Sequence, residues 1–170
     1  MARPRRLPAF DYTGVQRYFL TICTLDRLAH FIAAERVKLV VGQILRIATQ
    51  EGMTIPVYLL MPDHAHLLVD GENDAADLKT FMKLAKQHSG YEFKKKYQAQ
   101  LWQAGYYEHV LRDAERTEEV IEYIVSNPVR GKLVESPVDY PYWGSTVYTR
   151  EEILDFIGWA SHRYKPPWRE

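Results

Sequence analysis

The stretch TIPVYLLMPDHAHLLVD, residues 54–70, decides how this chain folds. It contains two apolar runs, Thr54–Met61 and His64–Asp70, with the dipeptide Pro62–Asp63 between them. Apolar runs of this length, bounded by turn residues, are typical of buried strands. Because only two residues join the runs, we expect them to form an antiparallel β-hairpin.

Outward from this hairpin, the spacing of apolar residues predicts further strands and helices. Asp74 is suited to cap a long helix, and Asn127–Pro128 is expected to end a later one, because the residue before proline avoids helical geometry. In chain order, the expected elements are a strand over 17–24, a helix over 33–50, the hairpin, a helix over 75–97, a strand over 106–111, a helix from Thr117 as its cap to Ser126, and a last helix over 151–160.

This order of elements points to a fold class. Strand, helix, strand, strand, helix and strand match the ferredoxin-like split βαβ pattern, an α+β fold in which helices cover one face of an antiparallel sheet. The C-terminal helix over 117–126 follows this unit. The 170 residues suit a single domain, with a basic arm over 1–10 and a short tail over 147–170. This fold serves many functions, so the function has to be argued from a site.

The overall composition narrows the function classes. Lys and Arg number 22 and Asp and Glu number 22, so the formal net charge is zero, which argues against a protein that coats DNA indiscriminately. The sequence shows no signal peptide and no apolar stretch long enough to cross a bilayer, so we expect a cytoplasmic protein without membrane contact. The single cysteine, Cys23, lies in an apolar run and is interpreted as buried.

His64 and His66 are the first candidate site residues. They flank Ala65 in the second strand of the hairpin, and because side chains alternate along a strand, both imidazoles should point to the same face. Two imidazoles side by side form a good partial metal site. Taken alone, a chance pair of surface histidines is the simpler interpretation.

Tyr123 and Asn127 form the second candidate pair. They are four residues apart in an expected helix and so share one face, whereas Ile121, Ile124 and Val125 point towards the core. A tyrosine with an amide one turn later offers a rigid platform for a nucleophile and an oxygen ligand. Taken alone, an amphipathic tyrosine followed by a helix-ending asparagine is the simpler interpretation.

Three motifs, taken together, resemble those of a known family. MPDHAHLLV (61–69), LWQAGYYEHVLRD (101–113) and YIVSNPVRGKLV (123–134) are similar to the tyrosine transposases associated with repetitive extragenic palindromes. These are relatives of the single-tyrosine insertion-sequence transposases within the HUH endonucleases. Three motifs in the same order make this resemblance far more specific than a His-x-His pair.

The resemblance implies a role for each candidate residue. In that family the histidine pair and a polar residue one turn after the tyrosine bind a divalent metal, and the tyrosine attacks DNA. Carried over position by position, His64, His66 and Asn127 are the expected metal ligands and Tyr123 is the expected catalytic nucleophile.

Two positions depart from the usual family pattern. Ala65 is small where a bulky apolar residue is common, which leaves the alternation of the strand intact. Asp63 stands where asparagine is common and adds a carboxylate next to the histidines. That carboxylate either strengthens the metal site or caps the turn.

The implied chemistry needs both parts of the site. A phenol, with an ordinary pKa of about 10, is a weak nucleophile at neutral pH without assistance, and a divalent cation on the scissile phosphate provides it. Two imidazoles and an amide oxygen leave positions open for phosphate and water, a set that fits Mg²⁺ or Mn²⁺. The resemblance implies cleavage and rejoining of single-stranded DNA through a 5′-phosphotyrosine, beside imperfect palindromes that form hairpins.

Local basic clusters are the candidates for DNA binding, and each has an alternative interpretation as a solvated surface. Trp102, Tyr106 and Tyr107 either stack on bases or belong to the core. The basic candidates are Arg3, Arg5 and Arg6 in the N-terminal arm, Lys83, Lys86, Lys94, Lys95 and Lys96 in the helix over 75–97, and Arg112, Arg116, Arg130 and Lys132 around the last two motifs.

Two alternative functions stay open at this stage. One is a non-catalytic, domesticated nucleic-acid-binding protein on the same fold, although the sequence lacks the glycine–aromatic motif of RNA-recognition modules. The other is a replication initiator or relaxase of the HUH type, which the length of 170 residues and the missing P-loop motif disfavour. We expect a monomer or a homodimer.

Overall fold

A computed structural model describes residues 10–112 and 116–159 of the chain. Its elements follow the predicted order, with boundaries that differ by a few residues. The strands are β1 (Arg17–Cys23), β2 (Met53–Met61), β3 (His64–Gly71), β4 (Tyr107–Val110) and β5 (Trp143–Gly144). The helices are α1 (Ala34–Gln50), α2 (Leu78–Tyr97), α3 (Thr117–Val125), α4 (Asn127–Arg130) and α5 (Arg150–Phe156).

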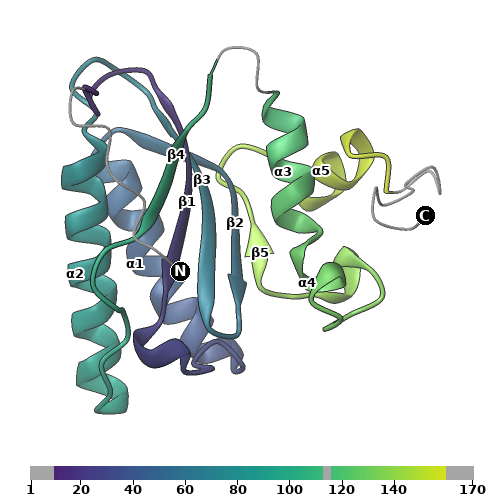
Figure 1. Ribbon diagram of the computed structural model, residues 1–170, viewed down its shortest axis with the longest axis horizontal. Coiled ribbons are helices and arrows are strands. Elements are labelled where there is room, and N and C mark those ends of the chain that lie inside the picture. The colour runs from purple at the N-terminus through teal and green to yellow at the C-terminus, as the bar shows by residue number, and fades with distance from the viewer. Residues whose placement is uncertain (1–9, 113–115, 160–170) are drawn as a thin grey trace.

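The strands form one antiparallel sheet in the order β4-β1-β3-β2-β5 (Figure 1). The first four strands take the order β4-β1-β3-β2, with α1 and α2 as connections, which is the ferredoxin-like arrangement. The predicted α+β fold class is therefore confirmed. The additional strand β5, which we did not predict, pairs with Tyr58 and Leu59 of β2. With only two residues, β5 is too short to show a periodic pattern.

The predicted hairpin of β2 and β3 is also confirmed. Met61 pairs with His64, so Pro62–Asp63 forms the tight turn between the strands. The register shifts between Thr54 and Val57, around a proline that has no N–H to donate to the ladder. The hairpin places both candidate histidines at the turn end of β3, in the middle of the sheet.

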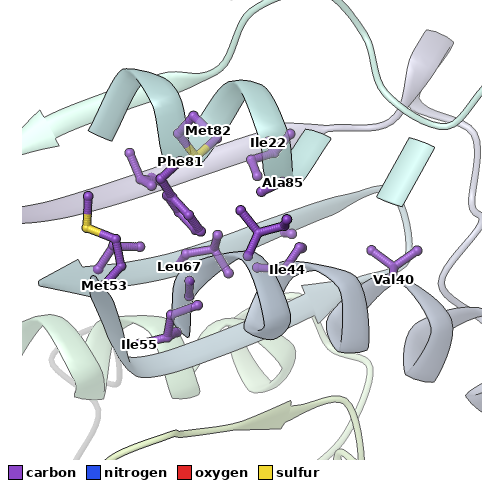
Figure 2. Packing of buried hydrophobic residues seen from close by; sticks show 14 of the residues in the cluster. Ile22, Val40, Ile44, Met53, Ile55, Leu67, Phe81, Met82 and Ala85 are labelled. Atoms are coloured by element: carbon purple, nitrogen blue, oxygen red, sulfur yellow. The ribbon is translucent and has the colours of Figure 1, made fainter. Parts of the chain in front are cut away.

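Helices α1 and α2 cover one face of the sheet (Figure 1). Their apolar side chains interdigitate there with those of the central strands, as Figure 2 shows for Ile22, Ile44, Leu67 and Phe81. Phe81 and Ala85 are one helical turn apart, so both point from α2 into this core.

The opposite face of the sheet is covered over part of its width by α3 and α5 (Figure 1). Ile121 and Ile124 of α3 belong to a second buried cluster with Leu59 of β2 and Leu68 of β3. The expectation of helices on one face holds for the ferredoxin-like unit and was incomplete for the whole chain. Within residues 10–112 and 116–159, α3 packs over β2 and β3, and β4 forms the edge of the sheet on the other side.

Two helix starts differ from the prediction for local reasons. Helix α2 begins at Leu78, because its cap is Asp77 and not Asp74; the Asp77 carboxylate accepts hydrogen bonds from the first turn. Thr117 is the first residue of α3 and not its cap, since its hydroxyl accepts a hydrogen bond from Arg17 at 2.7 Å.

Helix α3 ends at Val125 with Ser126 as its C-cap, within one residue of the predicted end. The predicted reason was wrong, because Asn127 and Pro128 are themselves helical and begin α4. Helix α3 passes through Ser126, which has helical dihedrals, into α4. The Asn127 side chain donates from Nδ2 to the carbonyls of Tyr123 and Ile124 at 2.9 and 3.2 Å. This amide supplies the donor that Pro128 lacks, so the helix continues past the proline.

The structure also bears on the cysteine and on membrane-spanning segments, which the composition addressed. Cys23 is buried at the end of β1, as predicted, and its sulfur accepts a hydrogen bond from Arg27. None of the helices within residues 10–112 and 116–159 has the length and apolarity needed to cross a membrane.

Asp70 carries a half-buried carboxyl on the partly covered face. It lies opposite Arg17 of β1, and its Oδ1 atom is buried without a hydrogen-bond partner. Burial raises the pKa of Asp70 to about 6, and Arg17 opposes this increase. The folded protein holds this proton more tightly than the unfolded chain, so stability is lost as pH rises through the folded pKa.

We predict that Asp70→Asn raises the free energy of unfolding at about pH 8, by on the order of 1 kcal/mol after allowance for partial exposure. The gain should shrink at about pH 5, where Asp70 is largely protonated and already neutral. Urea unfolding at both pH values measures the difference, with Asp74→Asn at an exposed position as the control. An equal gain at both pH values contradicts the burial of a charged Asp70.

Candidate active site

His64 and His66 lie edge to edge at the start of β3. Both point to the α3 side of the sheet, while Ala65 between them belongs to the core on the other side. Their Nε2 atoms are 3.2 Å apart, and their ring planes meet at 86°. His66 is buried and His64 is partly buried. The predicted placement of two imidazoles on one face is therefore confirmed as geometry.

The other ring nitrogens are held by two neighbouring side chains. Nδ1 of His64 donates to the Asp63 carboxylate at 2.6 Å, and Nδ1 of His66 lies 2.9 Å from the Thr21 hydroxyl. Arg27 donates to the second carboxylate oxygen of Asp63 at 2.8 Å. With its proton on Nδ1, His64 has its lone pair on Nε2, and Thr21 can hold His66 in the same tautomer by accepting.

Burial favours the neutral form of both imidazoles. Desolvation, followed by the nearby His64, Arg130 and Arg27, lowers the pKa of His66 to about 3. The pKa of His64 is also lowered, mainly by burial, while Asp63 opposes the decrease. A neutral imidazole offers a lone pair to a metal ion and a protonated one does not. The pair is therefore in a metal-binding protonation state at neutral pH.

The distance between the two nitrogens fits one divalent cation. Ligands at about 2.1 Å from a shared ion and at right angles to each other lie about 3.0 Å apart. This is close to the 3.2 Å between the Nε2 atoms. Within the described ranges, 10–112 and 116–159, no group of three or more His, Cys, Asp and Glu side chains is placed to hold a metal. A third protein ligand from these residues would be of another type, such as an amide oxygen.

Tyr123 projects from α3 on the same side of the sheet. It is 45% exposed although its neighbours Ile121 and Ile124 are fully buried. The Phe19 ring meets the Tyr123 ring edge-on, with 5.8 Å between centroids, and stacks on His66 with 5.5 Å between centroids. A tyrosine that solvent can reach and a buried imidazole thus contact the same phenyl ring, within one chain.

Asn127 is nearly buried, and its amide has a defined orientation. Because Nδ2 donates to two carbonyls of α3, the oxygen Oδ1 is directed at other groups. Arg130 donates to this oxygen at 3.1 Å, and its guanidinium also lies 4.1 Å from the centroid of the Tyr123 ring. An amide oxygen has two lone pairs, so Arg130 leaves it able to bind a cation.

These residues form a continuous set, which we call the His–Tyr cluster. It joins the hairpin to the C-terminal helices through β1, because Phe19 contacts both the histidine side and the tyrosine side. Its members are Phe19, His64, His66, Tyr123, Asn127 and Arg130.

The predicted DNA-binding residues fall into separate groups. Arg3, Arg5 and Arg6 lie outside the described residues. The α2 lysines are on the opposite face of the sheet from the His–Tyr cluster (Figure 1); they are Lys83, Lys86, Lys94, Lys95 and Lys96. Arg112, Arg116 and Lys132 are exposed in the segments after β4, before α3 and after α4, and Arg130 belongs to the cluster.

Lys86 has a structural role among these lysines. Its Nζ donates to the carbonyls of Gln103 and Gly105, and burial lowers its pKa to about 8. It fixes the loop that follows α2. Together with Tyr91 and Lys94 it also lines a shallow hollow of about 480 Å³.

The sequence did not point to Phe19, a member of the cluster, or to Thr21 and Arg27, which support it. Phe19 and Thr21 are two residues apart in β1, so the sequence predicts that they share a face of the sheet. Only the pairing of Thr21 with His66 shows that this is the face of the histidines. Arg27 gave no signal, because it lies in a turn where it and Asp26 have positive φ angles of 57° and 53°.

Known proteins provide an independent comparison. A sequence profile described as "Transposase IS200 like" matches residues 16–127. A protein of Haemophilus influenzae, named as a REP-associated tyrosine transposase, is 30% identical over 145 residues, which cover 78% of this chain and 81% of the relative.

Solved structures support the same fold. A REP-associated tyrosine transposase bound to a REP hairpin aligns over 100% of this chain and 92% of its own, with a TM-score of 0.70 and 18% identity. A transposase structure from Deinococcus radiodurans aligns over 75% of this chain and 97% of its own, with a TM-score of 0.50 and 23% identity.

We predict that His66 does not take up a proton between about pH 8 and pH 5 in the folded protein, because burial lowers its pKa to about 3. Two-dimensional ¹H–¹⁵N NMR of the ring nitrogens measures its titration. In urea-unfolded protein the same ring should titrate near its ordinary value of about 6.5. Proton uptake by the unfolded chain alone then reduces stability as the pH falls below that value. A folded-state midpoint within the tested range contradicts the prediction.

Proposed function

Because the chain belongs to the IS200-like transposase family, we propose that it cleaves and rejoins single-stranded DNA beside hairpins, with Tyr123 as the nucleophile. Family membership makes DNA transposition the general class of function. The observation that carries the finer proposal is the contact of Phe19 with both Tyr123 and His66. This contact links an exposed phenol to the buried imidazole of His66, whose ring meets that of His64.

His64, His66 and Asn127 are the residues that would hold a divalent cation, Mg²⁺ or Mn²⁺. Nitrogen ligands favour Mn²⁺ of the two. When bound, the cation supplies Lewis-acid stabilisation of the charge that develops on the scissile phosphate. Asp63 and Thr21 contribute indirectly, since each holds the Nδ1 atom of one imidazole and so directs Nε2.

The proposed cleavage step exchanges one phosphate ester for another. The Tyr123 oxygen attacks phosphorus and loses its proton, and the bond from phosphorus to the 3′-oxygen breaks. The leaving oxygen takes up a proton and becomes a 3′-hydroxyl, while the 5′-phosphate stays on Tyr123. A 3′-hydroxyl can later attack this phosphotyrosine and release the phenol, which joins two strands without hydrolysis.

Arg130 supports Tyr123 in this step. Its guanidinium lies over the Tyr123 ring, 4.1 Å from the ring centroid, and this cation–π contact holds the ring in place. Its hydrogen bond to Asn127 keeps the nucleophile and the proposed amide ligand in one arrangement. Arg130 thus acts as more than a phosphate contact.

The proposed substrate is single-stranded DNA next to an imperfect palindrome. A protein of the same fold has been solved with a REP hairpin, which supports a hairpin ligand here. Arg130 is the basic candidate within the cluster, Arg112 follows β4, and the N-terminal arm adds three further arginines. All members of the His–Tyr cluster come from one chain.

We predict that Tyr123→Phe abolishes covalent protein–DNA adducts, because the substituted ring has no oxygen to attack phosphorus. The assay incubates palindrome-flanked single-stranded DNA with the protein and Mn²⁺ and resolves the adduct on a denaturing gel. Tyr148→Phe is the matched control, since Tyr148 is a partly exposed tyrosine before α5. Unchanged cleavage by the Tyr123 variant contradicts the assignment. Full hairpin affinity with no adduct from the unsubstituted chain supports the non-catalytic alternative.

We predict that His64→Ala and Asn127→Ala each reduce adduct formation by about 100-fold or more, because a lost metal ligand removes transition-state stabilisation. Titration calorimetry with Mn²⁺ alone should show weakened binding, which separates a ligand role from a structural one. His109→Ala, at an exposed histidine of β4, should leave Mn²⁺ binding unchanged. Equal Mn²⁺ affinity in all three variants contradicts the proposed ligand set.

A further inference from the structure

A row of side chains crosses three neighbouring strands beside the His–Tyr cluster. The register pairs Thr21 of β1 with His66 of β3 on one side and with Tyr107 of β4 on the other. Partners in register point to the same face of a sheet, so Tyr107 faces the side that carries the histidines. Two strand spacings of about 4.8 Å put Tyr107 about 10 Å from His66 along this row.

Phe19 connects Tyr107 to the cluster. Its ring lies edge-on to Tyr107 with 6.4 Å between centroids, and it also contacts Tyr123 and His66. We call Phe19 and Tyr107 the aromatic shelf. The shelf extends from the proposed nucleophile to the outer strand of the sheet.

Tyr107 is exposed to solvent, unlike the nearby aromatic residues Trp102 and Tyr106. Tyr107 is 44% exposed, close to the 45% of Tyr123. Trp102 is buried and donates to Ser89, and Tyr106 packs against the core under α1 and α2. Core packing therefore explains Trp102 and Tyr106, whereas Tyr107 holds half of its ring in solvent next to a proposed active site.

The arrangement of the helices explains why this part of the sheet is uncovered. Helix α3 packs over β2 and β3, and among the described strands β4 is the outermost on the other side (Figure 1). Arg130 lies over Tyr123, whose ring contacts Phe19, so a cation stands at the Phe19 end of the shelf. Glu108, between the exposed residues of β4, points to the opposite face, where it accepts a hydrogen bond from Tyr12.

We propose that the aromatic shelf binds an unpaired nucleobase of the DNA strand that enters the active site, by stacking on Tyr107. This inference rests on the proposed function and adds a binding subsite to it. A strand whose phosphate lies at the histidines reaches Tyr107 within about three nucleotides at a stacked rise of about 3.4 Å each. An open ring on the same surface as the Arg130 cation suits single-stranded nucleic acid, because every base has a flat face and every linkage a negative charge.

The test is a double-mutant cycle between the side chain and the base. Tyr107→Leu, which keeps apolar bulk on the strand, and Tyr107→Phe, which keeps the ring, are compared with the unsubstituted residue, all in the Tyr123→Phe chain. Fluorescence anisotropy measures the Kd for hairpin DNA with a single-stranded flank and for the same DNA with one abasic nucleotide at each flank position. Thermal unfolding checks that the variants fold.

Tyr107→Leu should weaken binding by roughly 10-fold, and Tyr107→Phe should retain the original affinity. At one flank position, removal of the base should make the Leu and Tyr proteins bind equally. Tyr91→Leu, an exposed tyrosine of α2 beneath the other face, should show no such position-specific coupling.

An equal loss of affinity for every abasic oligonucleotide, or no loss in Tyr107→Leu, overturns the shelf. Binding is measured without cleavage, so the proposed function is judged separately by the Tyr123 adduct. A missing adduct with intact Tyr107 coupling contradicts the proposed chemistry alone, and an adduct without coupling contradicts the shelf alone.

Discussion

The packing of α3 against the β2–β3 half of the sheet is the constraint on which the rest of the site depends. Ile121 and Ile124 are buried against Leu59 and Leu68, and this anchoring sets the rotation of the helix. With that rotation, Tyr123 is directed at the uncovered half of the sheet and towards Phe19. A different rotation of α3 would bury the phenol or turn it away from the histidines, although the ferredoxin-like core would be unchanged.

Burial has a second effect on the same face, which is electrostatic. His66 lies under the helix layer, so its imidazole loses solvent and remains neutral. Nearby polar groups then set its direction, since Thr21 holds Nδ1 and leaves Nε2 towards His64. Asn127 follows the same logic: two carbonyls of α3 take its amide protons, and its oxygen is directed outwards. Burial therefore both keeps the imidazole of His66 neutral and leaves its orientation to the few polar groups beside it.

The two faces of the sheet differ in how they are covered and in what they contribute to the site. The face under α1 and α2 is a continuous apolar core, while on the other face the described part of the chain packs α3 over β2 and β3. The open remainder, over β1 and β4, carries the aromatic shelf beside the proposed nucleophile. Tyr107 of the edge strand is 44% exposed and contacts Phe19, which places the proposed stacking surface beside Tyr123.

Local pattern was enough to predict the hairpin of residues 54–70, the βαββαβ order and the shared face of His64 and His66. Each of these follows from alternation or helical spacing along a short stretch of chain. The exact cap at Asp77, the helix that continues past Pro128 and the two-residue strand β5 were not predictable, since each depends on a few side-chain bonds or on a distant partner. Phe19, Thr21 and Arg27 could be assigned to the site only from their contacts in the folded structure. Contacts between strands far apart in sequence are set by register and helix packing, which no local periodicity records.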